Sequence, residues 1–511
     1  MVLLQSSCST ILAYVMQSNL LPSKILDGLD WVNKNFLWGS TDQAKKMHWV
    51  NWSKVTKPKN LGGLGLQIAK GRNTALLAKL NWRLHMEGNA PWSKVLKLKY
   101  CTRQRINSRN AARLACSRMW KGLRKGEEVF KKGVKWVLGH NSKLNFWYDC
   151  WSDLGPLRNL IQGPFPREIE NLKIRDVWST SGWDWPTIPF ELPPEIKATV
   201  QAIPTPIFAR NGDKLAWKFS PKGVFDSRSA YLLALDYQDT NAFDGTWIWK
   251  LCTLPKIQMF MWKCLHQAIG VKECLVARGM QLNGSCPMCH VAYESIIHAL
   301  WDCNVVKPTW HQLGVQSNNS TFFSQGINEW LNTNAKSKRL PSSNHALWNV
   351  LFPFAIWLIW QQRNQTIFKG RGANPQLAKN IIMQATEYAL CISRPRRNQA
   401  RMIRQIRWEK PDIGWVKLNT NGSFSDLLNA AGYGGLIRDD QGNWIGGFSR
   451  HIGNTDSFLA EIWALRDGLQ LCHHMNLQSV IVELDASTVI DALNNPVYTN
   501  TILSPLFDDC K

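Results

Sequence analysis

The stretch from Trp415 to Asn495 has the most definite pattern in the chain and constrains the fold most strongly. Apolar residues alternate with polar ones, then form a continuous run, and turn residues separate the segments. The predicted elements are, in order, a strand, a hairpin, a helix, a strand and a helix, over residues 416–423, 433–438 with 444–452, 456–475, 480–485 and 486–495. This order predicts a mixed sheet covered by helices, with the strand at 480–485 buried on both faces.

Two carboxylates stand at prominent places in this pattern. Glu461 lies in the first part of the predicted helix, on the same face as its apolar residues, and Asp485 ends the strand that follows. Carboxylates that gather without a nearby cation repel one another and favour divalent metal ions. Two interpretations remain open, a metal site or two residues that each cap a helix.

Four blocks in this stretch resemble the ribonuclease H domain of plant non-LTR retrotransposons: LNTNGS, AGYGGLIRDDQGNWIGGFS, LAEIWALRDGL and VELDAS. The resemblance implies a site in which four acidic residues hold two magnesium ions and the RNA strand of an RNA–DNA hybrid is hydrolysed. The first three acidic positions fall on Asn421, Glu461 and Asp485, which makes these the implied catalytic residues, with magnesium at Glu461 and Asp485. The fourth position lies in a closing helix beyond Lys511, so the domain is expected to be truncated.

A second motif has metal-ligand spacing. Cys286 and Cys289 are separated by two residues, and His298 and Cys303 follow, which gives the pattern C-x2-C-x8-H-x4-C. These four residues can complete the tetrahedron of a structural zinc site, with no position left open for catalysis. The alternative is a pair of buried thiols with a helix histidine. Cys252, Cys264 and Cys274 fit no ligand spacing and are predicted to be core residues.

The sequence around this motif, WIWKLCTLPKIQMFMWKCLHQAI and ESIIHALWDC, resembles the zinc-binding domain that follows the reverse transcriptase in plant retroelements, over about residues 215–310. Near the N-terminus, FLWG, HWVNWSKVTKPKNLGGLGL, LLAKLNWRL and LKLKY resemble the segment downstream of the polymerase in the same elements. No aspartate pair stands in a polymerase-like strand-turn-strand. The chain is therefore expected to be the C-terminal part of such a polyprotein.

The net charge of +24 predicts a polyanionic partner, nucleic acid first and a membrane surface second. Together with the resemblance, it makes RNA, DNA or an RNA–DNA hybrid the expected partner. The most basic stretch runs from Lys94 to Lys135 and is interleaved with Trp and Tyr, which can stack on bases. A solvated helical face is the alternative. The residues predicted to contact nucleic acid are Arg103, Arg105, Arg109, Arg113, Arg118, Lys121, Arg124 and Lys125.

A membrane partner and secretion are not expected. The most apolar run, residues 346–360, is short for a span and contains Asn349 and Pro353, so a buried or amphipathic helix is predicted there. No secretory signal is evident, and the 13 cysteines are an odd number spread over the whole length. Reduced thiols in the nucleus or the cytoplasm are expected.

The predicted organisation is an α/β multidomain chain. Its regions are a helical basic region downstream of the polymerase, an irregular connection, a zinc-binding domain, a helical and basic linker, and an incomplete ribonuclease H-like domain, at 1–150, 151–210, 211–312, 313–406 and 407–511. Two functions compete. One is a nucleic-acid-binding protein whose ribonuclease H-like domain cleaves hybrids with impaired activity. The other is a zinc-knuckle nucleic-acid-binding remnant with no turnover.

Overall fold

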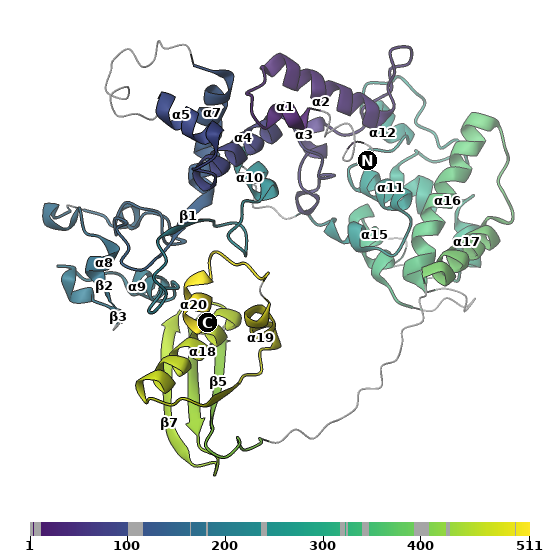
Figure 1. Ribbon diagram of the computed structural model, residues 1–511. Coiled ribbons are helices and arrows are strands. Elements are labelled where there is room, and N and C mark those ends of the chain that lie inside the picture. The colour runs from purple at the N-terminus through teal and green to yellow at the C-terminus, as the bar shows by residue number, and fades with distance from the viewer. Residues whose placement is uncertain are drawn as a thin grey trace. The chain divides into compact units, whose positions relative to one another are not determined.

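The structure is a computed structural model (Figure 1). It describes Leu4, Phe322 and residues 12–100, 116–163, 165–179, 182–236, 243–316, 325–339, 347–392, 408–425, 430–495 and 497–511. The described residues divide into two compact units. Unit 1 comprises those within Met1–Leu12, Pro22–Lys70 and Gln238–Met402, and unit 2 those within Ala13–Leu21, Gly71–Tyr237 and Ile403–Lys511.

Unit 1 is helical. Its longer helices are α2 (Ser23–Trp38), α11 (Pro255–Leu265), α15 (Ile327–Lys336), α16 (Trp348–Lys369) and α17 (Leu377–Ile392). Its short elements are α3 (Trp52–Val55), η2 (Lys59–Leu61), η7 (Thr246–Lys250), α12 (Lys272–Val276), η8 (His298–Asp302) and α13 (Lys307–Gln312). From Trp348 to Trp360, the apolar run lies in α16 and most of its side chains are buried, which confirms the predicted helix. No helix in the described part of the chain is long and apolar enough to cross a membrane.

The core of unit 1 is rich in aromatic rings. Trp330 lies 4.7 Å from Trp301 and 4.9 Å from Phe352, measured between ring centroids. Cys264 and Cys274 are buried in this core, as predicted, but Cys252 is exposed, so the prediction for Cys252 is wrong. Cys252 lies in the irregular segment between η7 and α11, which the surrounding helices do not cover on all sides.

Unit 2 begins with a helical layer. It contains α1 (Ala13–Met16), α4 (Ala69–Met86), α5 (Pro91–Tyr100), α7 (Arg118–Gly133) and α10 (Ser227–Ala234). α7 packs closely on α4 because Gly126 has no side chain: a Cβ there would lie 2.3 Å from the carbonyl carbon of Leu77. This close approach turns the buried face of α7 toward α4 and leaves its basic residues exposed.

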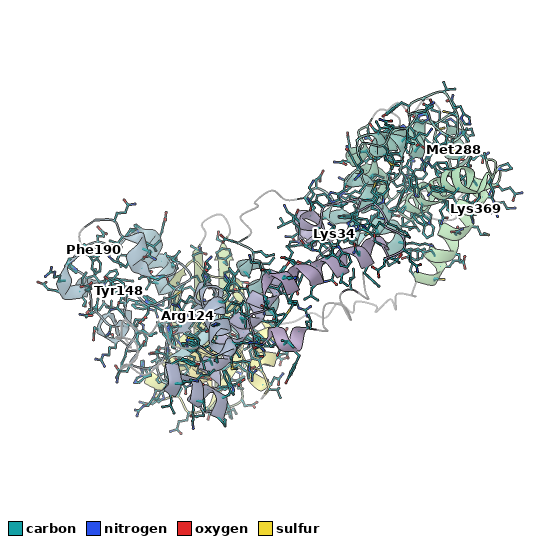
Figure 2. All side chains as sticks on the ribbon, turned by 90° about the horizontal axis from the view of Figure 1, so that it is seen from above. Lys34, Arg124, Tyr148, Phe190, Met288 and Lys369 are labelled. Carbon is teal, nitrogen blue, oxygen red and sulfur yellow. The ribbon has the colours of Figure 1, made fainter. Side chains whose placement is uncertain are left out.

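A tryptophan-rich cluster follows within unit 2. β1 (Val134–Val137) pairs antiparallel with β4 (Lys214–Trp217), and between them lie η4 (Leu157–Leu160), η5 (Arg167–Ile169), α8 (Ile174–Val177), β2 (Trp178–Ser179), β3 (Gly182–Trp183), η6 (Trp185–Thr187) and α9 (Pro194–Gln201). These short elements surround the buried rings of Phe146, Trp147 and Trp151. The ring of Phe190, labelled with Tyr148 in Figure 2, lies 5.8 Å from that of Trp147.

The C-terminal part of unit 2 is a four-stranded mixed sheet in the order β7-β6-β5-β8. The strands are β5 (Val416–Ser425), β6 (Ala430–Arg438), β7 (Trp444–Gly453) and β8 (Val480–Glu483). β5 pairs antiparallel with β6 and parallel with β8. The predicted strands and hairpin are confirmed. β8, however, is half-buried and not buried on both faces, because in the described chain it has a strand neighbour on one side only.

Helices α18 (Ser457–His474), α19 (Ser487–Asn494) and α20 (Ser504–Cys510) accompany the sheet. The Asp456 carboxylate caps α18 by accepting a hydrogen bond from the Leu459 N–H at 2.8 Å, which confirms the predicted start of this helix. α18 lies against β5 at Gly422, where a Cβ would come within 2.4 Å of the Ala460 carbonyl carbon. This contact brings the first turns of α18, and Glu461 with them, next to β5.

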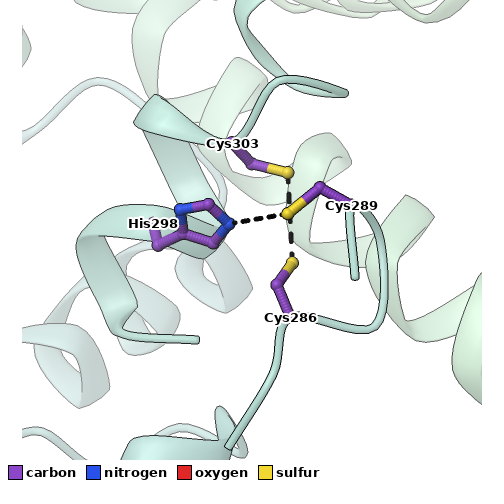
Figure 3. Close-up of side chains that lie close together, drawn as sticks. All are labelled: Cys286, Cys289, His298 and Cys303. Atoms are coloured by element: carbon purple, nitrogen blue, oxygen red, sulfur yellow. Dashed lines mark hydrogen bonds between the residues drawn. The ribbon is translucent and has the colours of Figure 1, made fainter. Parts of the chain in front are cut away.

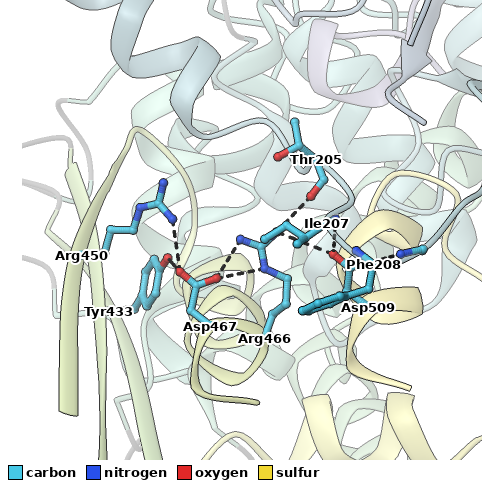
Figure 4. A network of polar contacts seen from close by, with 9 residues as sticks. Thr205, Ile207, Phe208, Tyr433, Arg450, Arg466, Asp467 and Asp509 are labelled. Carbon is cyan, nitrogen blue, oxygen red and sulfur yellow. Dashed lines mark hydrogen bonds and ion pairs between the residues drawn. The ribbon is translucent and has the colours of Figure 1, made fainter. Parts of the chain in front are cut away.

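A polar network joins the sheet to residues 205–209 of the same unit (Figure 4). The buried Arg466 guanidinium donates to Asp467 at 2.8 and 3.0 Å and to the Thr205 carbonyl at 2.9 Å. The Tyr433 hydroxyl also donates to Asp467. On α20, the Asp509 carboxylate accepts from the backbone N–H groups of residues 207, 208 and 209 at 2.7, 2.9 and 2.7 Å. The sheet is thereby fixed to the segment that precedes β4.

Candidate metal centres

The four residues with metal-ligand spacing converge on one point (Figure 3). Their ligand atoms all lie within 4.8 Å of one another. The sulfurs of Cys286 and Cys303 are 4.0 Å apart, and the sulfur of Cys289 is 3.4 Å from Nε2 of His298. A tetrahedral zinc ion with bonds of about 2.3 Å to sulfur and about 2.0 Å to nitrogen separates such ligands by about 3.5–3.8 Å. The cluster therefore fits zinc.

A tight turn presents the first two thiols. The N–H of Cys286 donates to the Ala292 carbonyl at 2.7 Å, and the N–H of His290 donates back to the Cys286 carbonyl at 2.9 Å. His290 adopts a left-handed backbone conformation with φ 58°. His298 then begins the single turn of η8, and Cys303 follows the end of that turn. Local backbone geometry thus positions all four side chains.

Asp302 fixes the orientation of His298. Its Oδ1 lies 2.6 Å from Nδ1 of His298, which leaves Nε2 facing the three sulfurs. A ligating histidine commonly donates its second ring N–H to a carboxylate, which sets the tautomer and makes the metal-facing nitrogen more basic. The sequence analysis did not identify Asp302. The signal was its position four residues after His298, which places both side chains on one face of a helical turn.

The electrostatics of the cluster favour a thiolate. The Cys303 thiol, hydrogen-bonded to Cys286, holds the pKa of Cys286 well below its usual range, at about 4, and the backbone N–H groups of Cys289 and Met288 act in the same direction. The same hydrogen bond raises the pKa of Cys303, which keeps the shared proton. Thiolates are the form in which cysteine binds metal, and the lowered pKa of Cys286 favours that form.

A buried ion pair connects the metal cluster to the helical core of unit 1. Glu294 lies between Cys289 and His298 and accepts from the Arg363 guanidinium of α16 at 2.8 and 2.7 Å. Both side chains are almost fully buried. Removal of one partner of such a pair leaves an uncompensated buried charge, which destabilises strongly. The two residues are 69 positions apart, so sequence spacing alone could not reveal this contact.

The second candidate site lies where β5, α18 and β8 meet. Glu461 is buried and has one carboxylate oxygen, Oε2, without a hydrogen-bond partner among the described residues. Burial raises the pKa of Glu461, and the nearby Asp485 raises it further, while the Gly422 N–H opposes the shift. The structure therefore brings Glu461 and Asp485 together, beside the backbone of β5.

Asn421 stands at the edge of this carboxylate pair. The parallel register pairs Asn419 with Glu483, so Asn421 and Asp485 lie two residues further along neighbouring segments. Asn421 is exposed, and no hydrogen bond joins it to either carboxylate in the described part of the chain. Among the described residues, no third carboxylate, histidine or cysteine completes this pair, in contrast to the four ligands of the first site.

The residues predicted to contact nucleic acid fall into two groups. Arg103, Arg105, Arg109 and Arg113 lie outside the described residues. Arg118, Lys121, Arg124 and Lys125 lie on α7, are exposed, and form no ion pair within the described chain. By contrast, Lys131 and Lys132 on the last turn of α7 pair with Glu127 and Glu128 at 2.6 and 3.3 Å.

Comparisons with known proteins match both regions. A family model described as zinc-binding in reverse transcriptase matches residues 225–310, and one described as reverse transcriptase-like matches residues 419–511. A provisionally named ribonuclease H protein of Arabidopsis thaliana is 32% identical over 515 residues, which cover 98% of this chain and 82% of that protein. An uncharacterized mitochondrial protein of the same plant is 28% identical over 117 residues, 23% of this chain and 75% of that protein.

Two solved structures show weaker similarity. RNase H1 of the archaeon Halobacterium salinarum is 19% identical, with a TM-score of 0.18, and the match covers 19% of this chain and 74% of that one. The N-terminal RNase H domain of a Mycobacterium tuberculosis protein is 20% identical, with a TM-score of 0.17, covering 19% of this chain and 70% of that one. The match to the first Arabidopsis protein, by contrast, extends over 98% of this chain. The chain belongs to the family of the Arabidopsis ribonuclease H protein and carries the zinc-binding and ribonuclease H-like regions of plant non-LTR retrotransposon reverse transcriptases.

Proposed function

We propose that this protein binds nucleic acid and carries a ribonuclease H-like domain directed at the RNA strand of RNA–DNA hybrids, with cleavage that is impaired in this chain. The observation that carries the binding proposal is the exposed face of α7. Arg118, Lys121, Arg124 and Lys125 present four cations there, with no carboxylate paired to them in the described residues. Unpaired cations on one helix face can neutralise phosphates and release their counterions.

The proposal of impaired cleavage rests on the charge of the second site. Glu461 and Asp485 can supply two carboxylates, and Asn421 supplies a neutral amide where the resemblance implies an acid. Bound magnesium would supply activation of water and stabilisation of the leaving oxygen. The amide carbonyl of Asn421 can still act as a ligand, but it does not offset the positive charge of a second ion. We expect at most one loosely held ion at Glu461 and Asp485.

We also propose that Cys286, Cys289, His298 and Cys303 hold one structural zinc ion. Four protein ligands fill a tetrahedral coordination sphere, so the ion would have no open position for substrate. Its role would be to fix the turn at 286–289 against η8 and, through Glu294 and Arg363, against α16.

A second candidate function is nucleic-acid binding without cleavage, and Asn421 favours it. In that case the protein is a zinc-knuckle nucleic-acid-binding remnant, and Glu461 and Asp485 have no catalytic role. The two candidates share the binding activity and differ only in hybrid cleavage, so binding and cleavage need separate measurements.

The binding proposal is tested by neutralising α7. The variant changes Arg118, Lys121, Arg124 and Lys125 to Gln, and the control changes four exposed cations elsewhere in unit 2, at Lys143, Arg167, Arg210 and Lys222. Titrations of labelled duplex at several salt concentrations should show weaker binding by the α7 variant and a salt slope reduced by about one per lost phosphate contact. An unchanged affinity and salt slope would show that the exposed face of α7 does not contact nucleic acid.

A further inference from the structure

Unit 1 contains a groove of about 430 Å³ between α11 and α16. The two helices lie side by side in Figure 1, and residues 268–270 and Trp49 complete the walls. Its volume is within the range of about 300–1,000 Å³ that is typical of ligand sites. Five aromatic side chains contribute to the lining, and no aspartate or glutamate does.

The aromatic rings of the groove are incompletely buried. Trp49, Trp357 and Trp360 are partly exposed, and Phe368 near the end of α16 is 77% exposed. Trp360 stacks on the buried Phe260, with a centroid distance of 5.7 Å, and Trp357 meets the same ring edge-on at 5.4 Å. Phe260 thus packs beneath Trp357 and Trp360, and all four partly exposed rings line the groove.

Two lysines of α11 border the same groove. Lys256 and Lys263 are seven residues apart and therefore share one face of the helix. Their ammonium nitrogens lie 5.9 Å from the Trp357 ring centroid and 5.5 Å from that of Trp38. Neither forms an ion pair within the described chain, although Lys263 is half-buried and its burial lowers its pKa. Arg363, in contrast, is neutralised by Glu294.

These features suit a ligand that has flat aromatic faces and negative charge together. Unpaired nucleobases provide the faces, and the phosphates that connect them provide the charge. A double helix exposes its phosphates but keeps its base faces stacked inside. It could therefore pair with the lysines but could not stack on the aromatic rings.

We propose that the groove between α11 and α16 binds single-stranded nucleic acid, with bases against Trp357, Trp49 and Phe368 and phosphates at Lys256 and Lys263. The proposal rests on the proposed nucleic-acid-binding function. It adds a second contact region, in unit 1, that prefers unpaired strands, whereas the α7 face in unit 2 contacts phosphates of any strand.

The test is fluorescence anisotropy of the full chain with labelled oligo(dT), oligo(U) and a duplex, each of about 12 nucleotides, which is within known single-strand site sizes. One variant combines Lys256→Gln with Lys263→Gln, a second is Phe368→Ala, and a third is Trp357→Leu. The matched controls are Lys379→Gln and Leu390→Ala, at exposed positions on α17. Circular dichroism and zinc content confirm folding, and the two lysine changes and Phe368→Ala remain informative if Trp357→Leu does not fold.

The groove variants should lose about fivefold or more in affinity for the single strands. Their duplex affinity and both controls should stay at the wild-type level. Ultraviolet cross-linking of oligo(dT) should label peptides that contain residues 255–265 or 348–369. Equal binding of oligo(dT) and oligo(U) assigns the site to unpaired strands in general, and a preference for one assigns it to that strand.

Other outcomes overturn the proposal. Folded groove variants that bind single strands like the wild type would show that the groove is not the site. An equal loss of duplex affinity would show that Lys256 and Lys263 act only as surface charge. Wild-type protein that binds neither single strands nor duplex would contradict the proposed function itself, which separates that failure from a failure of the groove.

Discussion

Two sites are built from metal-binding side chains: the zinc-type cluster of Cys286, Cys289, His298 and Cys303, and the carboxylate pair of Glu461 and Asp485. They differ in the number of ligands and in the parts of the chain that supply them. The four ligands of the cluster come from 18 consecutive residues, 286–303, and their ligand atoms already lie within 4.8 Å of one another. The carboxylate site draws on β5, α18 and the end of β8, and among the described residues only Glu461 and Asp485 contribute charge to it. Local backbone geometry brings the cluster residues together, whereas the carboxylate pair meets only when the whole sheet has formed.

This difference indicates which change each site can tolerate. The cluster has three thiols and a histidine packed together, and the Cys303 thiol shares a hydrogen bond with Cys286. If the cluster holds a metal ion as proposed, loss of that ion should affect folding. At the carboxylate site, Asn421 lies where the resemblance implies an acid, on a strand that is paired with β6 along its length. Loss of a ligand there can abolish chemistry while the sheet stays intact.

The largest effect is expected from opening the zinc-type cluster. Cys289→Ser should lower the zinc content from one ion per chain and should reduce the melting temperature of unit 1. Structural zinc contributes about 10 kcal/mol or more to the folding of zinc-finger peptides, and a larger domain should lose a part of that. Elemental analysis and differential scanning calorimetry measure both, with Cys252→Ser, an exposed thiol outside the cluster, as control. Wild-type protein that is folded but contains no zinc would contradict the proposed zinc site.

The next effect is expected at the contact that builds the carboxylate site. Gly422→Ala places a Cβ within 2.4 Å of the Ala460 carbonyl carbon and 2.5 Å of the Glu461 nitrogen, so α18 must move away from β5. Overpacking of this kind costs about 1–3 kcal/mol, sometimes more. Gly432→Ala on β6 is the control, since its Cβ meets nothing closer than 3.5 Å. Hydrogen exchange of residues 457–474 should be faster in the Gly422 variant only, and equal exchange in both would contradict this packing.

These two sites also show how far the sequence alone predicts the structure. Periodicity predicted β5, β6, β7 and α18, because each follows from the order of neighbouring residues. The spacing of Cys286, Cys289, His298 and Cys303 predicted their convergence for the same reason. The half-buried state of β8 was not predicted, because it depends on which strands lie beside it.

Contacts between distant residues could not be predicted from patterns of this kind. The Glu294–Arg363 pair, the Asp509 contacts with residues 207–209 and the groove between α11 and α16 each join segments far apart in the chain. The packing of the short elements around Trp147 has the same origin, since its partners Phe165 and Phe190 are brought together only by the fold. Local sequence determines where elements begin and end, and tertiary contacts determine which side chains meet.

A smaller effect is expected from the charge of Glu461 on the stability of unit 2. Burial raises the pKa of Glu461, so its charged form is disfavoured in the folded state. The stability that protonation contributes is fully present below the usual glutamate pKa and is lost as the pH rises through the raised value. Glu461→Gln should therefore stabilise unit 2 at pH 7 and make no difference near pH 4. Thermal unfolding at the two pH values measures this, and a variant that is less stable at pH 7 would contradict the sign.

The central claim is that Asn421 leaves the ribonuclease H-like site impaired, and hybrid cleavage in magnesium tests it most directly. Fresh wild-type protein, Asn421→Asp and Glu461→Gln are compared on one labelled RNA–DNA hybrid, and mass spectrometry verifies that Asn421, which precedes Gly422, has not deamidated to aspartate. We expect wild-type cleavage at the background level of Glu461→Gln, and cleavage above that level in Asn421→Asp. Robust cleavage by wild-type protein with intact Asn421, or no gain in Asn421→Asp, would contradict the claim.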